Sequence, residues 1–187
     1  MNRGKDESNQ IVTASLAPMA SFSLNHRCKT RSLANLKGSY CLLAYLSKGC
    51  LMAFGKNSAF FPRGWYAYVG SAMNGIDKRV QRHLRSHKKM RWHIDFLLDK
   101  AVVKEVIAMS SELREECAKA AALKAIGGLV IAKRFGSTDC RCETHLLFFR
   151  SNPMKRRDFW EALGGRLDPG CLCLSCGPAS VHSPRSP

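Results

Sequence analysis

Apolar and polar positions divide the chain into a central segment with clear periodicity and two polar ends. Residues 40–46 form a β-rich apolar run, a turn follows at residues 47–49, and a second apolar run covers residues 50–54. Two such runs separated by a short Gly-containing turn are typical of a β-hairpin. We therefore expect strands at residues 40–46 and 50–54 that pair with each other.

The same patterns predict the remaining elements. Further strands are expected at residues 65–69, 102–109, 129–135 and 145–149. Ile76, Val80 and Leu84 recur at the four-residue spacing of a helix that begins near Gly75. The apolar stretch 90–98 is compatible with either a strand or a helix.

Two helices are predicted in the second half of the chain. Ser110 or Ser111 is a candidate cap for an Ala-rich helix that ends at Gly127-Gly128. A short helix is expected over residues 158–163. The fold class is α+β: a small mixed or antiparallel β-sheet flanked by helices, in one domain over residues 38–165. Residues 1–37 and 166–187 are polar or rich in Gly, Pro, Ser and Cys, and are expected to be disordered tails.

Composition narrows the classes of protein. The 187 residues are 45% hydrophobic, which excludes a wholly disordered basic chain, and no apolar run approaches the roughly 18–20 residues that cross a bilayer. The net charge of +16 indicates a polyanionic partner, but says nothing about the fold.

The positive charge is concentrated between Met73 and His93, where seven lysines and arginines accompany one acid, Asp77. A solvated helix face is the ordinary interpretation, but the lack of interleaved acids makes a phosphate-binding surface at least as good. A membrane-bound helix ranks lower, because its apolar face lacks Trp and Phe anchors. The candidate nucleic-acid-binding residues are Lys78, Arg82, Arg85, Lys88, Lys89 and Arg91.

Nine cysteines, an odd number, and the lack of a secretory signal indicate a reducing, cytoplasmic setting. An organelle-targeting role for residues 19–32, which lack acids, is the alternative. Cys41 and Cys117 lie in apolar stretches and are interpreted as ordinary buried thiols.

Six residues form two chemical clusters: Cys140, Cys142 and His145, and, in the C-terminal tail, Cys171, Cys173 and Cys176. Zinc favours these ligands, but paired structural ligands normally lie two to four residues apart. A buried thiol pair or a reversible local disulfide is therefore favoured over zinc for the first cluster.

Several short motifs occur in a specific order. Gly38-Ser39-Tyr40 opens the first strand, Tyr68-Val69-Gly70 closes the third, and Arg79 and His83 follow on the next helix. This order resembles the GIY-YIG endonuclease superfamily. The similarity is greater to a small uncharacterised branch, a domain of unknown function that is sometimes fused to endonuclease III-type DNA glycosylases. The other motifs that carry it are Arg82-His83-Leu84, Trp92-His93-Ile94-Asp95, Glu116-Cys117 and Asp139-Cys140-Arg141-Cys142 with His145-Leu146.

The resemblance implies roles for five residues. Tyr40 and Tyr68 would flank the attacking water, with Arg79 lowering the pKa of a tyrosine and clamping the phosphate. His83 would donate to a phosphate or carry a proton, and Glu116 would hold one Mg²⁺ or Mn²⁺ ion. Two departures from the superfamily are Ser39, where a β-branched apolar residue is usual, and the long spacing between the two tyrosine motifs.

His93 and Asp95 would share one face of a strand. A satisfied polar pair in the core is the first interpretation, and a general-base couple or a phosphate contact are the alternatives.

The leading hypothesis is a metal-dependent nuclease that acts on DNA rather than RNA, with a DNA-repair protein as an implied partner. One alternative is a module of the same fold that binds nucleic acid without cleaving it. The other is a zinc-stabilised interaction protein. No membrane partner is expected, and no oligomeric state is predicted.

Overall fold

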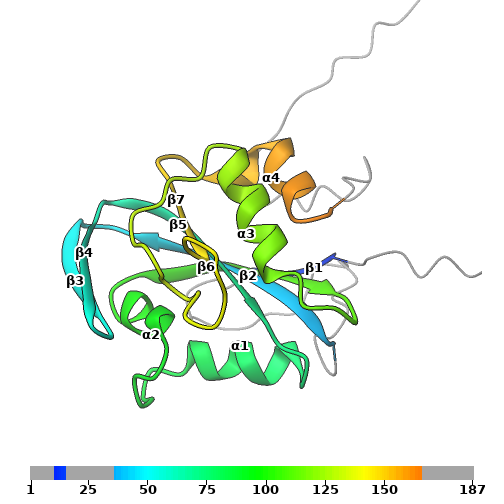
Figure 1. Cartoon of the computed structure of the whole chain (residues 1–187), viewed down its shortest axis with the longest axis horizontal. Helices are drawn as coiled ribbons and strands as arrows, with labels where there is room; N and C mark the ends of the chain where they lie inside the picture. The colour runs from blue at the N-terminus through cyan, green and yellow to red at the C-terminus, as the bar shows by residue number, and fades with distance from the viewer. Residues whose placement is uncertain (1–10, 16–35, 166–187) are drawn as a thin grey trace, which may run out of the picture.

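A five-stranded antiparallel sheet forms the centre of the computed structural model, which describes residues 11–15 and 36–165. The strands lie in the order β1-β6-β2-β5-β7, and β3 and β4 form a separate two-stranded hairpin (Figure 1). The strands are β1 (Ile11–Ser15), β2 (Gly38–Leu46), β3 (Cys50–Phe54), β4 (Asn57–Phe61), β5 (Gly64–Ser71), β6 (Val102–Ser110) and β7 (Leu146–Phe149). The helices are α1 (Ile76–Leu84), α2 (His93–Leu98), α3 (Glu116–Ala125), the 3₁₀ turn η1 (Pro153–Lys155) and α4 (Arg157–Ala162). The predicted α+β class is confirmed.

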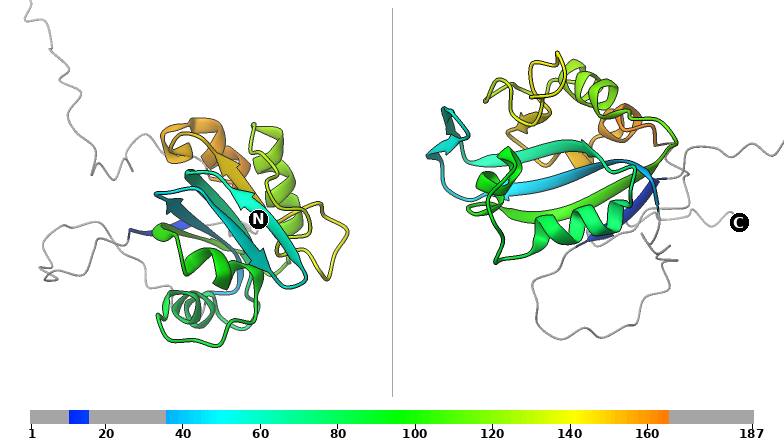
Figure 2. Two further views of the ribbon diagram at one scale, coloured as in Figure 1. Left: turned by 90° about the vertical axis from the view of Figure 1, so that its left-hand side faces the viewer. Right: turned by 60° about the horizontal axis from the view of Figure 1, so that its bottom comes forward.

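Helices cover both faces of the sheet. α1 and α2 lie on one face and α3 and α4 on the other, as the views in Figure 2 show. Successive residues of a strand point to opposite faces, so β2 sends Tyr40 and Leu42 towards α1, and Cys41 and Leu43 towards α3. This explains why β2 has an almost continuous apolar run rather than an alternating pattern, since both of its faces are buried.

The predicted pairing of residues 40–46 with residues 50–54 is wrong. Both edges of β2 are occupied, by β5 on one side and β6 on the other, and β3 pairs instead with β4. Residues 57–61, for which no strand was predicted, form β4. The hairpin contributes Phe54 and Phe61 to the core on the α1 side.

Residues 129–135 do not form the predicted strand. Only Leu129 bridges to β7, and the segment then turns. Arg134 (φ 62°) and Gly136 (φ 73°) adopt the left-handed conformation, which ends any extended run. The apolar side chain of Phe135 is nevertheless fully buried, and this burial accounts for the apolar pattern.

Two local predictions also differ from the structure. α3 begins at Glu116, five or more residues after the serines expected to cap it, although it ends before Gly127-Gly128 as predicted. The stretch 90–98 forms a loop and then α2, so His93 and Asp95 are not on a strand.

β1 lies within the predicted N-terminal tail and pairs with β6, where it forms one edge of the sheet. The rest of that tail, the targeting alternative at residues 19–32 and the cluster of Cys171, Cys173 and Cys176 lie outside the described residues. Within the described ranges, no helix has the length and apolar character needed to span a membrane.

We predict that Leu42→Ala lowers the free energy of unfolding by about 2–5 kcal/mol, because Leu42 is fully buried in the central strand. Urea denaturation measures the loss. Leu51→Ala is the matched control, since Leu51 is 72% exposed on the hairpin, and its effect should be small. Equal losses in the two variants would contradict the assigned positions of β2 and β3.

Candidate functional site

Tyr40, Tyr68 and His83 form a cluster of rings between the sheet and α1. The Tyr40 hydroxyl lies 2.8 Å from Nε2 of His83, in a buried contact. The Tyr68 ring lies 6.4 Å from each of the other two rings, measured between centroids. Three of the predicted site residues, from β2, β5 and α1, are therefore in one place.

The register of β2 and β5 makes room for this cluster. Tyr40 lies opposite Gly70, and a Cβ atom at position 70 would lie 2.5 Å from the Tyr40 hydroxyl oxygen. Only glycine lets the tyrosine ring lie across the neighbouring strand in this way. Gly70 of the Tyr68-Val69-Gly70 motif thus makes room for Tyr40 of the Gly38-Ser39-Tyr40 motif.

Asp95 is a fully buried carboxylate that joins α1 to α2. Arg82 donates two hydrogen bonds to it, each of 2.8 Å, and the backbone N–H groups of Arg91 and Trp92 donate one each. Burial acts to raise the pKa of Asp95, but these hydrogen bonds hold it well below its usual range. Asp95 also lies 3.7 Å from Nδ1 of His83, on the side of the ring away from Tyr40.

His83 is buried between the tyrosine and the carboxylate. Burial lowers its pKa to about 4, so the imidazole is neutral near pH 7. When the Tyr40 hydroxyl donates to Nε2, the ring proton resides on Nδ1 and faces Asp95. Tyr40 and His83 thus form a hydrogen-bonded pair, and Asp95 lies beside the ring without a hydrogen bond to it.

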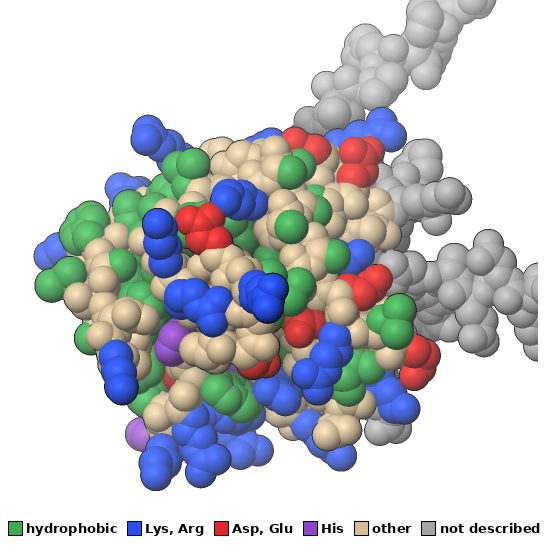
Figure 3. All heavy atoms as spheres, viewed as in Figure 1, with side chains coloured by type: hydrophobic (Ala, Val, Ile, Leu, Met, Phe, Trp, Pro, Cys, Tyr) green, Lys and Arg blue, Asp and Glu red, His purple; other side chains and the backbone are tan. Residues whose placement is uncertain are grey.

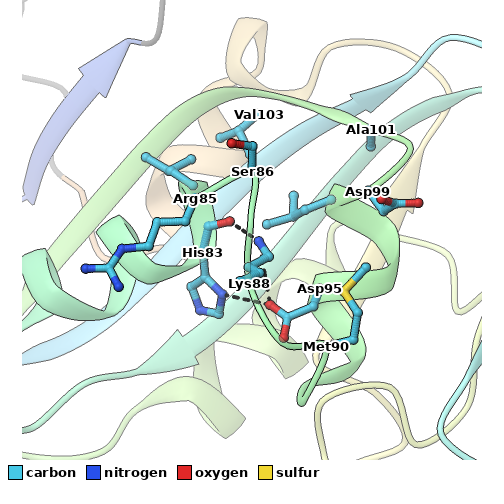
Figure 4. A pocket seen from close by; sticks show the side chains of 11 residues that line it. His83, Arg85, Ser86, Lys88, Met90, Asp95, Asp99, Ala101 and Val103 are labelled. Atoms are coloured by element: carbon cyan, nitrogen blue, oxygen red, sulfur yellow. Dashed lines mark hydrogen bonds and ion pairs between the residues drawn. The ribbon is translucent and has the colours of Figure 1, made fainter.

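A cavity of about 380 Å³ opens on the far side of this pair. His83 and Asp95 line it together with Lys88 and residues at the start of β6. Figure 4 shows Lys88 between the backbone carbonyl of His83, to which it donates a hydrogen bond, and the Asp95 carboxylate, 3.7 Å away. The two tyrosines do not line this cavity.

Arg79 lies one turn before His83 and packs over Trp92, with its guanidinium carbon 4.5 Å from the ring centroid. Arg82 packs on the same ring at 3.9 Å, but is also bound to Asp95. Among the described residues, none forms a hydrogen bond or an ion pair with the side chain of Arg79. Its guanidinium is therefore available to an anion.

Burial raises the pKa of both tyrosines, that of Tyr68 to about 12. Arg79 lowers both values, as the sequence analysis expected, but its effect is smaller than that of burial. The prediction of a tyrosine with a lowered pKa is therefore wrong. Both hydroxyls stay protonated near neutral pH.

Glu116 begins α3 on the other face of the sheet, but its charge acts on Tyr68. One of its carboxylate oxygens is buried and has no hydrogen-bond partner among the described residues. Ser39 holds this end of the helix, because its hydroxyl accepts a hydrogen bond of 3.2 Å from the backbone N–H of Glu115. The serine that departs from the superfamily pattern thus anchors the predicted metal ligand.

His93 and Asp95 do not act as a pair. His93 faces the segment before β7, and its Nδ1 accepts a hydrogen bond of 3.2 Å from the backbone N–H of Gly136. Its ring packs against Phe54 and Phe135. The expected polar pair does not form, because the two residues lie on a helix and face different neighbours, with Asp95 buried and His93 half-buried.

Cys140, Cys142 and His145 are joined by a residue that the sequence analysis interpreted as an isolated thiol. Cys117, the second residue of α3, places its sulfur so that all four ligand atoms lie within 4.8 Å of one another. The cysteines of this group are free thiols. Burial and the neighbouring thiols raise the pKa of Cys117 to about 12. No local spacing signals this ligand, since Cys140 lies 23 positions further along the chain.

A family comparison places this geometry in context. Residues 39–165 match the family described as "Domain of unknown function DUF123". The chain belongs to this family. No curated protein and no solved structure matches the chain. The resemblance to an uncharacterised domain family is thereby confirmed, while the wider GIY-YIG relationship remains a prediction.

The matched region of this DUF123 chain includes the whole basic segment. Lys and Arg side chains gather along the lower edge of the face in Figure 3, over α1 and the loop that leads to α2. Lys78, Arg85, Lys89 and Arg91 are exposed. Arg82 and Lys88 are half-buried beside Asp95. These two of the six predicted phosphate-binding residues therefore pair with a buried carboxylate of the protein itself.

We predict that His83 makes the free energy of unfolding depend on pH. The unfolded chain binds a proton at His83 near pH 6.5, whereas the folded protein does so only near pH 4. The contribution of His83 to stability is complete above pH 6.5 and falls as the pH drops to about 4, by about 3 kcal/mol. Urea denaturation at pH 7 and pH 4.5 should therefore show a smaller pH effect in His83→Gln than in the unmodified protein. His87→Gln, at an exposed position, is the control, and parallel behaviour of all three proteins would refute the assignment.

Proposed function

We propose that this protein is a metal-dependent endonuclease of the GIY-YIG type that hydrolyses phosphodiester bonds in DNA. The observation that carries the proposal is the contact between the Tyr40 hydroxyl and His83, with Tyr68 and Arg79 beside it. This combination supplies a proton acceptor and a cation for a phosphate. Both requirements of phosphodiester hydrolysis are met by residues of one small region.

The proton path follows from the hydrogen bonds. A water that attacks phosphorus gives its proton to the Tyr40 oxygen, while the Tyr40 proton passes to Nε2 of His83. Asp95, 3.7 Å from Nδ1, offsets part of the cost of forming the buried imidazolium. This route needs no free tyrosinate, which agrees with the raised pKa of Tyr40. The departing sugar oxygen takes up a proton from solvent.

Arg79 and Glu116 would act on the phosphate from two sides. The guanidinium of Arg79 is suited to bidentate contact with phosphate oxygens, where negative charge increases in the transition state. The Glu116 carboxylate oxygen that has no hydrogen-bond partner among the described residues is suited to a Mg²⁺ or Mn²⁺ ion, because these ions prefer oxygen ligands. Such an ion, when bound, would neutralise charge on the phosphate.

Nucleic-acid binding without cleavage is the second candidate function. The high tyrosine pKa values favour it, because they remove the tyrosinate base that the resemblance implied. The exposed cations of the α1–α2 region support binding in either case.

We predict that the unmodified protein nicks supercoiled plasmid DNA in Mg²⁺ or Mn²⁺. Tyr68→Phe, Arg79→Ala and Glu116→Gln should each reduce the rate by about 10²-fold or more, because each removes a group next to the reacting phosphate. A gel assay of plasmid forms measures the rate.

Matched controls accompany each variant. Tyr45→Phe removes a hydroxyl near the other end of β2, where it accepts a hydrogen bond from Arg63. Arg157→Ala and Glu112→Gln remove exposed charges away from the rings. All three should retain full activity. An unmodified protein that binds DNA but nicks none with either ion would refute the endonuclease and favour the binding module.

We also predict which cations contact DNA. Lys89→Ala and Arg85→Ala should weaken binding uniformly across sequences, and each should reduce the slope of log affinity against log salt by about 0.9. Fluorescence anisotropy over a salt series measures the slope. Arg157→Ala, on α4 across the sheet, should leave it unchanged. Equal effects of all three substitutions would show that the α1–α2 region is not the contact surface.

A further inference from the structure

The four ligand atoms of Cys117, Cys140, Cys142 and His145 come from two segments that meet at the end of β5. Cys117 belongs to the first turn of α3, and the other three belong to the segment that precedes β7. That segment is bound to the sheet beside Tyr68, because the backbone N–H of Val69 donates to the carbonyl of His145.

Two distances between the ligand atoms match those of a tetrahedral zinc site. Nε2 of His145 lies 3.6 Å from the sulfur of Cys117 and 3.5 Å from that of Cys140. A zinc ion with bonds of about 2.3 Å to sulfur and about 2.0–2.1 Å to nitrogen places these two ligand atoms about 3.5–3.6 Å apart. A disulfide, by contrast, would leave the histidine without a role and needs two sulfurs about 2.05 Å apart.

Hydrogen bonds that involve no metal hold the segment with Cys140, Cys142 and His145 in its conformation. The Arg134 guanidinium donates to the carbonyl oxygens of Cys140 at 2.6 Å and of Cys142 at 3.2 Å. The backbone N–H of Arg134 donates to the carbonyl of Glu143, and that of His145 donates to the carbonyl of Phe135. The ligands are therefore held in place by the fold, as in a site built for an ion.

We propose that Cys117, Cys140, Cys142 and His145 bind one Zn²⁺ ion in a closed structural site. Three thiolates and an imidazole are preferred zinc ligands, whereas Mg²⁺ and Mn²⁺ favour oxygen. Four protein ligands leave no open position for substrate, so the ion stabilises the fold rather than acting as a catalyst.

The site links two parts of the molecule that carry the candidate chemistry. Cys117 follows Glu116 directly, and His145 is hydrogen-bonded to the residue after Tyr68. A zinc ion would thus fix the first turn of α3 against the end of β5. This positioning role rests on the proposed function, but zinc binding itself does not.

The test is metal analysis of the full chain, purified without chelator under reducing conditions. We expect about one zinc ion per chain by mass spectrometry, and loss of the ion in Cys117→Ser and Cys142→Ser. Cobalt(II) substitution should give the intense visible absorption of a tetrahedral thiolate site. A chelator should lower the melting temperature of the unmodified protein but not that of Cys117→Ser.

Two control variants separate this site from the other cysteines. Cys50→Ser removes a half-buried free thiol outside the cluster, and should retain the ion. A triple variant with serine at Cys171, Cys173 and Cys176 tests the C-terminal cluster, and should also retain it. Loss of zinc in the triple variant with retention in Cys117→Ser would overturn the proposal. Failure of the folded, reduced protein to take up zinc or cobalt would do the same.

The zinc and nuclease proposals fail separately. Full zinc binding without nicking would refute only the endonuclease. Nicking by a zinc-free protein, with Cys117→Ser as active and as stable as the unmodified chain, would refute only the zinc site.

Discussion

The buried carboxylate of Asp95 is the interaction on which the candidate site depends. It accepts two hydrogen bonds from Arg82 and one from each of the backbone N–H groups of Arg91 and Trp92. Removing one partner from such a pair leaves an uncompensated buried charge, which costs far more than a surface ion pair is worth. The pairing joins α1 to α2, places His83 against Tyr40 and presents Trp92 to Arg79. Asp95 thus fixes the positions of several residues in the positively charged segment between Met73 and His93.

The second constraint lies at one end of β5, where the start of α3 and the segment before β7 come close to Tyr68. β7 pairs with residues 65–68 only, and beyond them the backbone of Val69 bonds to His145 instead. The start of α3 comes close enough for the charge of Glu116 to act on Tyr68, which belongs to the opposite face. Among the described residues, Glu115 and Glu116 at the start of α3 each have a buried carboxylate oxygen without a hydrogen-bond partner, and neither residue lines the cavity behind His83.

Sequence reasoning predicted the elements whose periodicity is long and clear, and failed where a tertiary contact decides the outcome. The stripe of Ile76, Val80 and Leu84 marks α1, and the apolar run of β6 marks a strand. The partner of β3 could not be derived, because pairing depends on which edges of β2 are free. Tyr40 and His83 were grouped by resemblance, whereas the engagement of Arg82 by Asp95 and the fourth ligand Cys117 arise only from long-range packing.

Ser39 and Tyr40 are consecutive residues of β2 that point to opposite faces of the sheet. Ser39 holds the backbone before α3, and Tyr40 holds His83 on α1. A single peptide unit therefore carries one connection between the two helical layers of the domain. A small rotation of that unit would disturb the contact at the N-terminal end of α3 and the contact of the tyrosine hydroxyl at the same time. The Tyr40 ring lies so close to the backbone at Gly70 that a Cβ atom there would be 2.5 Å from the hydroxyl oxygen, so this backbone limits how far the ring can move.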